Sequence, residues 1–339
     1  MFLRNCWYVV AWDHEIPAQG LFARRVIGEP LVLFRAGDGS VVALEDRCCH
    51  RLAPLSRGRI EDGCLRCGYH GLLFDRDGRC IEVPGMEQVP AGTQVRAYPV
   101  RVHNRWVFVW MGVPEQANDA WLPDNHSCDS PDWVYRPGYL HYDVPWQLVC
   151  DNLLDFSHLS YVHEKTLGGT PAIARARPAI EGIERGLRIA RHVPGVPPPP
   201  YYSALREFKG LIDRWLVYDF VLPATLLMDS GGCEQGASPN DPERSVHLQS
   251  CQALTPESES STHYFFQQAH PAHLGDAAMT EGLYQGVVRA FEEDRDMISA
   301  QYERVRERGE GAMQSLPMDA ALLRFRQLIA KECARERAD

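Results

Sequence analysis

Cys48-Cys49-His50 and Cys67-Gly68-Tyr69-His70, with residues 51–66 between them, form the stretch around which this 339-residue chain is organised. The pattern reads C-x-H, a spacer, then C-x-x-H. Thiolate and imidazole groups at such short spacing are typical ligands of zinc, copper or an iron–sulfur cluster. Gly68 and Gly71 follow the second cysteine and allow the backbone to approach an inorganic group closely. The stretch therefore predicts a metal centre.

Two plainer interpretations compete with an iron–sulfur centre. Cys64 and Cys67 form a C-x-x-C pair that a structural zinc site could use, and ordinary buried cysteines and histidines are the second alternative. Zinc fingers tend to pair like ligands, whereas each loop here carries one cysteine and one histidine. This mixed set favours a Rieske two-iron two-sulfur cluster, in which two histidines replace two cysteines on one iron.

The composition is that of an ordinary globular protein, with 45% hydrophobic and 24% charged residues. A net charge of −10 argues against a nucleic-acid partner. No apolar run reaches the ~20 residues of a membrane span, and residues 1–8 lack the apolar core of an export signal. Eleven cysteines without such a signal predict free thiols in a reducing cytoplasm, with no membrane association.

The length predicts two domains, residues 1–115 and residues 116–339. In the first, short β-rich runs alternate with turns such as Asp77-Gly78, which predicts an all-β domain. The strands that we expect there are residues 7–12, 24–27, 31–35, 41–44, 72–74, 80–83, 95–100 and 106–111.

The second domain opens with a polar segment, residues 116–140, that we interpret as a linker. Further strands are expected at residues 139–144, 214–222, 245–254 and 261–268, and helices at residues 147–163, 280–308 and 318–332. Residues 164–212 contain Gly168-Gly169 and the run Pro197–Pro200, which excludes a regular helix or a central strand at the prolines. The segment also contains short β-like pieces, and we interpret residues 164–212 as a mobile loop or lid.

The predicted helix 147–163 carries a second group of polar side chains among mostly apolar neighbours. Asp155, His158 and His163 lie there, with Asp151 and Asn152 just before them. Carboxylates and imidazoles in such a segment need partners when they are buried. Two histidines and a carboxylate form the facial triad of non-haem iron(II) oxygenases. For each residue taken alone, a structural histidine or a solvated carboxylate is the alternative.

The spacing sets a geometric condition on this second site. His158 and His163 are five residues apart, so a regular helix would place them about 140° apart. The helix must therefore be distorted, for example by a π-bulge, or must end before His163. Asp155 and His158 share a face, so the carboxylate can accept a hydrogen bond from one imidazole nitrogen while the other binds metal.

Together these motifs resemble the catalytic (alpha) subunits of Rieske non-haem iron aromatic oxygenases, over nearly the whole chain. Within this family the chain resembles the subgroup of vanillate O-demethylase, dicamba O-demethylase and toluenesulfonate methyl-monooxygenase. The motifs that carry this resemblance are Arg47-Cys48-Cys49-His50, Tyr69-His70-Gly71-Leu72 and Asn152-Leu153-Leu154-Asp155-Phe156. Cys49 stands where the family often has proline. The resemblance implies an α+β chain, in which an all-β Rieske domain precedes a helix-grip (START/Bet v1-like) catalytic domain with an antiparallel sheet.

The resemblance also implies two sets of ligands. The 2Fe-2S cluster would be held by two ligands on each iron, namely Cys48 with Cys67 and His50 with His70. The mononuclear Fe(II) would be held by His158, His163 and Asp294. In the acidic segment around the last ligand, Glu293 and Asp296 are the nearest competitors, and solvated surface charge is the alternative for all these acids.

Other residues receive roles that do not require them to bind metal. By the resemblance, Asp155 links His158 to His70 of a neighbouring subunit, and Asn152 borders the iron. Head-to-tail contacts of this kind close into rings, here a homotrimer. A substrate pocket is expected between the helix 147–163 and the later strands, with Gln267, Gln268 and His270 as polar lining. Alternation lets Gln268 and His270 share a strand face, and exposure to solvent is the alternative for them.

The function implied is the terminal oxygenase component of a monooxygenase, an oxidoreductase that consumes O2. It would hydroxylate a methyl or methoxy group of a small, anionic aromatic substrate, which for a methoxy group is oxidative demethylation. The chain lacks a GxGxxG fingerprint, so NAD(P)H would act only through a separate reductase or ferredoxin. An aromatic ring cis-dihydroxylating dioxygenase is the alternative on the same scaffold. A Rieske electron carrier is the third possibility, which the second ligand set argues against.

Overall fold

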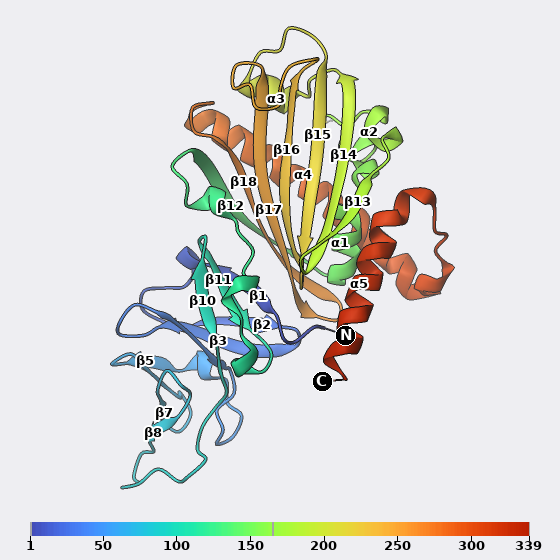
Figure 1. Cartoon of the computed structure of the whole chain (residues 1–339). Coiled ribbons are helices and arrows are strands. Elements are labelled where there is room, and N and C mark those ends of the chain that lie inside the picture. The colour runs from blue at the N-terminus through green and yellow to red at the C-terminus, as the bar shows by residue number, and fades with distance from the viewer. Residues whose placement is uncertain (1, 165, 339) are drawn as a thin grey trace. The chain divides into compact units, whose positions relative to one another are not determined.

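The computed structural model describes residues 2–164 and 166–338, and internal contacts divide the chain into two units (Figure 1). The first unit comprises residues 1–122 with residues 255–259. The second comprises residues 123–254 and 260–339. The boundary expected between residues 115 and 116 falls within a 3-10 helix, Pro114–Gln116.

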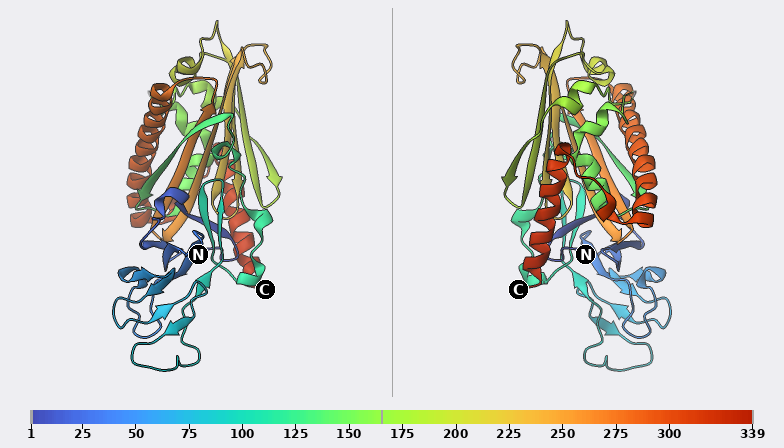
Figure 2. Two further views of the ribbon diagram at one scale, coloured as in Figure 1. Left: turned by 90° about the vertical axis from the view of Figure 1, so that its left-hand side faces the viewer. Right: turned by 90° about the vertical axis from the view of Figure 1, so that its right-hand side faces the viewer.

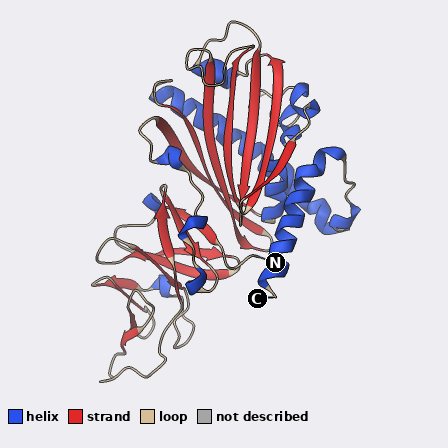
Figure 3. Cartoon of the chain, in the orientation of Figure 1, coloured by secondary structure: helices blue, strands red, loops and turns tan. Residues whose placement is uncertain are grey.

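The first unit is built from short antiparallel strands with 3-10 turns between them (Figure 3). Its strands form sheets in the orders β1-β11-β10, β2-β3-β4-β9 and β5-β6-β7-β8. Their bounds are β1 Trp7–Trp12, β2 Phe22–Val26, β3 Glu29–Arg35, β4 Val41–Glu45, β5 Arg59–Glu61, β6 Cys64–Arg66, β7 Leu73–Phe74, β8 Cys80–Glu82, β9 Ala97–Tyr98, β10 Val100–His103 and β11 Trp106–Trp110. The predicted all-β character is confirmed. Strands β5 and β6 were not predicted, because residues 59–66 contain no run of β-branched or aromatic side chains.

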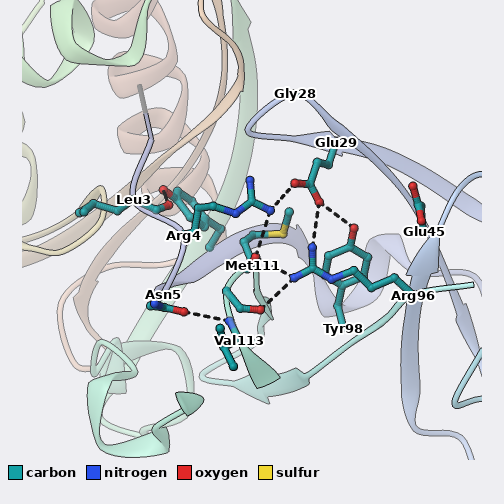
Figure 4. A network of polar contacts seen from close by, with 12 residues as sticks. Leu3, Arg4, Asn5, Gly28, Glu29, Glu45, Arg96, Tyr98, Met111 and Val113 are labelled. Carbon is teal, nitrogen blue, oxygen red and sulfur yellow. Dashed lines mark hydrogen bonds and ion pairs between the residues drawn. The ribbon is translucent and has the colours of Figure 1, made fainter. Parts of the chain in front are cut away.

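A polar network ties the start of the chain to β3 and β9 of the first unit (Figure 4). Glu29 accepts a hydrogen bond from the Tyr98 hydroxyl at 2.8 Å and forms ion pairs with Arg4 and Arg96. Arg96 also donates to the carbonyl oxygen of Met111 at 3.0 Å. Burial raises the pKa of Glu29, but the Arg4 and Tyr98 hydrogen bonds and the two guanidinium charges outweigh it. The pKa therefore lies below its usual 4.5.

The second unit contains an antiparallel sheet in the order β12-β18-β17-β16-β15-β14-β13 (Figure 1). The strand bounds are β12 Trp133–Tyr142, β13 Ala179–Ile183, β14 Gly186–Val196, β15 Ile212–Val221, β16 Thr225–Glu234, β17 Ser245–Ser258 and β18 Ser261–Pro271. The helices are α1 Trp146–Leu154, α2 Pro171–Arg175, α3 Pro200–Leu205, α4 Ala277–Arg308 and α5 Ala320–Glu336. The predicted fold class, an all-β domain followed by a helix-grip domain, is confirmed.

Helix α4 lies along one face of this sheet, against β12 and β18 (Figure 2). The Asp276 side chain caps its start by accepting from the Met279 N–H at 2.9 Å. The helix ends at Gly309, whose positive φ of 81° suits a residue without a side chain. Within the described residues, no helix has the length and the apolar sequence that crossing a membrane requires.

Two predictions for the second unit need correction. The helix expected over residues 147–163 ends at Leu154, because Asp155 has extended backbone angles (φ −100°, ψ 91°); a 3-10 helix, Phe156–Ser160, follows. The mobile loop or lid expected over residues 164–212 is wrong, since this segment holds α2, β13, β14 and α3. Pro200 is tolerated at the first position of α3, where no backbone N–H is needed.

Candidate functional site

The two cysteine–histidine loops of the first unit have the same backbone design. The Cys48 N–H donates to Ala53 and the Cys67 N–H to Leu72, each at 2.8 Å. The carbonyl of each cysteine then accepts from the residue four positions later, Leu52 or Gly71. Both of these residues have positive φ, 57° and 76°. The loops are therefore paired turns that hold their cysteines in equivalent positions.

The four predicted cluster ligands differ in their exposure to solvent. Cys48 and Cys67 are buried in the hydrophobic core of the first unit, whereas His50 and His70 are exposed, with ring centroids 4.5 Å apart. Gly68 has no room for a side chain, because a Cβ there would lie 2.6 Å from the carbonyl oxygen of Arg57. Two sulfur donors below two imidazole donors fit the donor set of a Rieske cluster.

Helix α4, the 3-10 helix and the turn after it bring the second predicted ligand set together. The Oδ1 atom of Asp294 lies 3.0 Å from Nε2 of His163 and 3.5 Å from Nε2 of His158. One donor atom from each residue falls within 4.8 Å of the others. His163 lies beyond the end of both helical segments, which resolves the 140° conflict of a regular helix.

Each of these three side chains is oriented by a neighbour. Nδ1 of His163 lies 2.9 Å from Oε2 of Glu293, which also accepts from the Thr166 hydroxyl at 2.7 Å. Nδ1 of His158 contacts the backbone carbonyl of Asp155. Nδ2 of Asn152 donates to Asp294 Oδ1 at 3.0 Å. Both imidazoles thus turn Nε2 toward Asp294, and the donor set fits a mononuclear metal held by a facial triad.

The carboxylate of Asp155 is used differently from the prediction. It accepts hydrogen bonds from the Ser157 N–H and hydroxyl, at 2.9 and 2.6 Å, and pairs with Arg191 at 3.4 Å. Only its backbone carbonyl contacts His158. The helix ends at this residue, so the face-sharing of a regular helix does not apply.

Burial and charge act in opposite directions on the two histidines. Burial lowers the pKa of His158 more strongly than the nearby Asp294 carboxylate raises it. Burial also lowers the pKa of His163, but Asp294 and Glu293 together outweigh it and raise the pKa. The Asp294 carboxylate thus lies between two imidazoles in a desolvated pocket, an arrangement that a cation would stabilise.

A cavity of about 430 Å³ opens beside this triad within the second unit. Its walls come from the inward face of β15–β18 and from α3, α4 and the 3-10 helix. Most of the lining is apolar. The polar side chains of the sheet that line it are Arg214, Tyr218, Ser230, Ser250, Gln252 and Gln268. This volume suits a single small aromatic molecule.

The structure separates the predicted polar lining residues. Gln268 lines the cavity, but His270 does not; its ring lies 2.8 Å from the Thr280 hydroxyl, near the start of α4. Gln267 is buried and donates to Ser127 at 2.9 Å. Sequence reasoning missed Arg214, although alternation along β15 places it on the same face as Leu216 and Tyr218.

Comparison with known proteins matches two segments of the chain to known families. Residues 6–99 match the Rieske [2Fe-2S] domain, and residues 142–335 match the vanillate O-demethylase oxygenase C-terminal domain. The iron–sulfur subunit TsaM1 of the toluene-4-sulfonate monooxygenase system of Comamonas testosteroni is 45% identical over 335 residues, which is 97% of this chain and 96% of that protein.

Solved structures of dicamba monooxygenase share the whole fold. The complex with 3,6-dichlorosalicylic acid has a TM-score of 0.92 at 31% identity, and the match covers 100% of this chain and 99% of the other. The structure with non-haem iron and dicamba has a TM-score of 0.85 at 30% identity, covering 99% of each chain. The family predicted from the motifs is confirmed. This chain belongs to the Rieske oxygenases, oxidoreductases that here join a Rieske [2Fe-2S] domain to the C-terminal domain of the vanillate O-demethylase oxygenases.

Proposed function

We propose that this Rieske oxygenase hydroxylates a methyl or methoxy group of an aromatic, anionic substrate, with O2 and with electrons from a separate reductase or ferredoxin. One observation carries the proposal, namely the convergence of His158, His163 and Asp294 at the wall of a mostly apolar cavity of about 430 Å³. The relatives support it, because toluene-4-sulfonate carries a methyl group and an anionic group on one ring.

The proposal assigns the two iron groups to separate domains, the cluster to residues 1–115 and the mononuclear iron to residues 116–339. The cluster would be held by Cys48, Cys67, His50 and His70. The iron would be held by His158, His163 and Asp294. When bound, these groups supply single-electron transfer and O2 activation, which no side chain of the cavity can provide.

The reaction balances with the partners that we propose. One O2, two electrons and two protons convert a C–H bond into C–OH and release the second oxygen atom as water. A hydroxylated methyl group is a stable alcohol. A hydroxylated methoxy group is a hemiacetal and collapses to a phenol and formaldehyde. The electrons come from NAD(P)H through the reductase.

The side chains of the second unit would bind the ring and hold the site in shape. Leu216, Met228 and Leu248 form an apolar wall that excludes water from the ring. Asn152 holds the Asp294 carboxylate through its hydrogen bond at 3.0 Å. Gln268 offers an amide to a polar substituent. A ring bound in this way would have its reacting C–H bond next to His158, His163 and Asp294.

We also propose a homotrimer in which Asp155 of one subunit faces His70 of the next. The exposure of His70 and the fixed position of the Asp155 carboxylate, held by Ser157 and Arg191, support this arrangement. A head-to-tail contact that closes into a ring needs two such different surfaces. A reducing compartment such as the cytoplasm belongs to the same proposal, because none of the eleven cysteines forms a disulfide in the described residues.

Product analysis tests the reaction class. The holoenzyme, supplied with a reductase and NADH, is given methyl- and methoxy-substituted benzoates and benzenesulfonates while O2 uptake is recorded. Formation of a benzylic alcohol or of formaldehyde, in step with O2 uptake, is expected. A cis-diol would instead identify a ring dioxygenase. Protein that holds about three irons per chain but shows no substrate-dependent O2 uptake would contradict the proposal.

A further inference from the structure

Arg214 is a buried cation on the wall of the cavity. It lies on β15 and is only 3% exposed. Its Nη2 donates to the Tyr201 hydroxyl at 2.6 Å, and its Nη1 lies 3.4 Å from the carbonyl oxygen of Gly168. Both partners are neutral, and Nε has no hydrogen-bond partner. No carboxylate in residues 2–164 or 166–338 forms an ion pair with this guanidinium.

Other arginines of the same sheet are neutralised within the chain. Arg191 is also buried, and its guanidinium lies 3.4 Å from Asp155. Arg188 is half-exposed and pairs with Asp219 at 2.6 Å. Besides its neutral hydrogen-bond partners, Arg214 lies near the faces of Tyr201 and Tyr202, at 5.7 and 5.3 Å from their centroids. An aromatic face weakly stabilises a cation but does not neutralise it, and an arginine cannot shed its proton.

The local structure leaves space for this guanidinium. Alternation along β15 turns Arg214 to the cavity side with Leu216. The residue directly across on β16 is Gly232, where a Cβ would lie 2.6 Å from Ile212. Most of the cavity wall is apolar. A buried charge in such surroundings is destabilising unless an anion accompanies it.

We propose that Arg214 is the substrate-recognising residue of the cavity and that it binds the carboxylate or sulfonate group of an aromatic substrate. This inference rests on the proposed function. The planar guanidinium can donate two parallel N–H bonds, from Nε and a neighbouring Nη, to two oxygens of either anion. Anchoring the anionic end fixes which part of the ring reaches His158, His163 and Asp294.

Binding to the holoenzyme without O2 tests the inference separately from turnover. Isothermal titration compares 4-methylbenzenesulfonate and 4-methylbenzoate with 4-methylbenzenesulfonamide, which has nearly the shape of the sulfonate but no charge. The wild-type protein is expected to bind at least one anion roughly 30- to 1,000-fold more tightly than the sulfonamide. The two anions distinguish a sulfonate site from a carboxylate site.

Variants attribute the preference to this residue. Arg214→Met is expected to abolish the preference for anions, and Arg214→Lys to keep a charge but lose most of the affinity. Arg188→Met, which removes a half-exposed arginine of the adjacent strand, is the matched control and should bind as the wild type does. The visible spectrum of the cluster and the thermal midpoint check that each variant is folded.

Each outcome bears on only one of the two proposals. Equal binding of the sulfonamide and the anions by the wild type would overturn the role of Arg214, even if Arg214→Met failed to fold. A folded Arg214→Met variant that still prefers the anions to the sulfonamide would also overturn the role of Arg214. So would a folded Arg214→Lys variant that binds the anions as tightly as the wild type does. Tight anion binding without any O2-dependent product would leave the Arg214 site intact and reject the proposed reaction.

Discussion

At the scale of single residues, Glu293 contacts His163, one of the proposed ligands of the mononuclear iron. Its carboxylate accepts from Nδ1 of His163 and from the Thr166 hydroxyl. This contact selects the tautomer that leaves Nε2 of His163 free and raises its electron density. The sequence offered Glu293 only as a competitor of Asp294, yet the two adjacent acids contact different ring nitrogens of His163.

Replacing Glu293 by alanine is therefore expected to weaken the mononuclear metal site. Iron affinity should fall roughly 10- to 100-fold, because His163 loses the group that orients it. Iron and acid-labile sulfide analysis, with chelator competition, measures the effect. The cluster content should not change. Glu292→Ala, which removes the preceding acid of the same helix, is the control, and unchanged iron retention in Glu293→Ala would refute the role.

A second residue-scale prediction concerns pH and the first unit. The folded-state pKa of Glu29 lies below 4.5, so its ion pairs stabilise the fold above the unfolded-state pKa. That contribution is lost as the pH falls through the folded-state value. Glu29→Gln should lower the free energy of unfolding by about 1 kcal/mol at pH 7. The difference from wild type should shrink below pH 4.5.

Urea unfolding followed by tryptophan fluorescence at several pH values from 7 down to about 3 provides the measurement. Glu115→Gln, at an exposed glutamate of the same unit, controls for the loss of one surface charge. A deficit in Glu29→Gln that stays constant over this pH range would show that the carboxylate charge is not responsible.

At the scale of elements, an ion pair links α1 to α5. Nη2 of Arg326 lies 2.5 Å from Oδ2 of Asp151. Burial raises the pKa of Asp151, and the hydrogen bond and charge of Arg326 only partly counter it. Asn152, next along α1, holds Asp294. The position of α1 therefore affects the site directly.

Removing one partner of this pair should cost more than removing both. Arg326→Met is expected to lower the free energy of unfolding by about 2–4 kcal/mol, since it leaves a buried carboxylate unpaired. Asp151→Leu combined with Arg326→Met should recover much of that loss. Chemical denaturation measures both, with the exposed Arg324→Met as the control. Equal destabilisation in the single and double variants would rule out the unpaired-charge explanation.

At the scale of the whole molecule, the proposed trimer makes electron delivery a property of two chains. His70→Ala removes a proposed cluster ligand, and His158→Ala removes a proposed ligand of the mononuclear iron. Each variant alone is expected to be inactive. Unfolding and refolding are not needed to mix them, because co-expression gives mixed oligomers in which an intact cluster can face an intact iron site of the next chain. Partial recovery of product formation is expected, and its absence would exclude the cross-subunit route.

Local spacing in the sequence predicted the chemistry of both sites. The cysteine–histidine loops, the group from Asp155 to His163 and most strands can be seen within windows of about twenty residues, because turn geometry and alternation are local properties. Helical periodicity also favours Asp294, which follows Leu283 and Phe291 on the buried stripe of α4, whereas Asp296 is exposed.

Only the tertiary structure decided how distant segments share these groups. Strand β16 was missed because Asp229-Ser230-Gly231-Gly232 reads as a turn, yet its neighbours in the sheet extend it. Strands β13 and β14 lie within the segment predicted to be a lid, and they too form because neighbouring strands of the sheet pair with them. The unpaired charge of Arg214 and the contact of Glu293 with His163 depend on which strands and helices meet. Spacing along a chain determines the ligand types, but burial and partners arise from contacts between residues far apart in sequence.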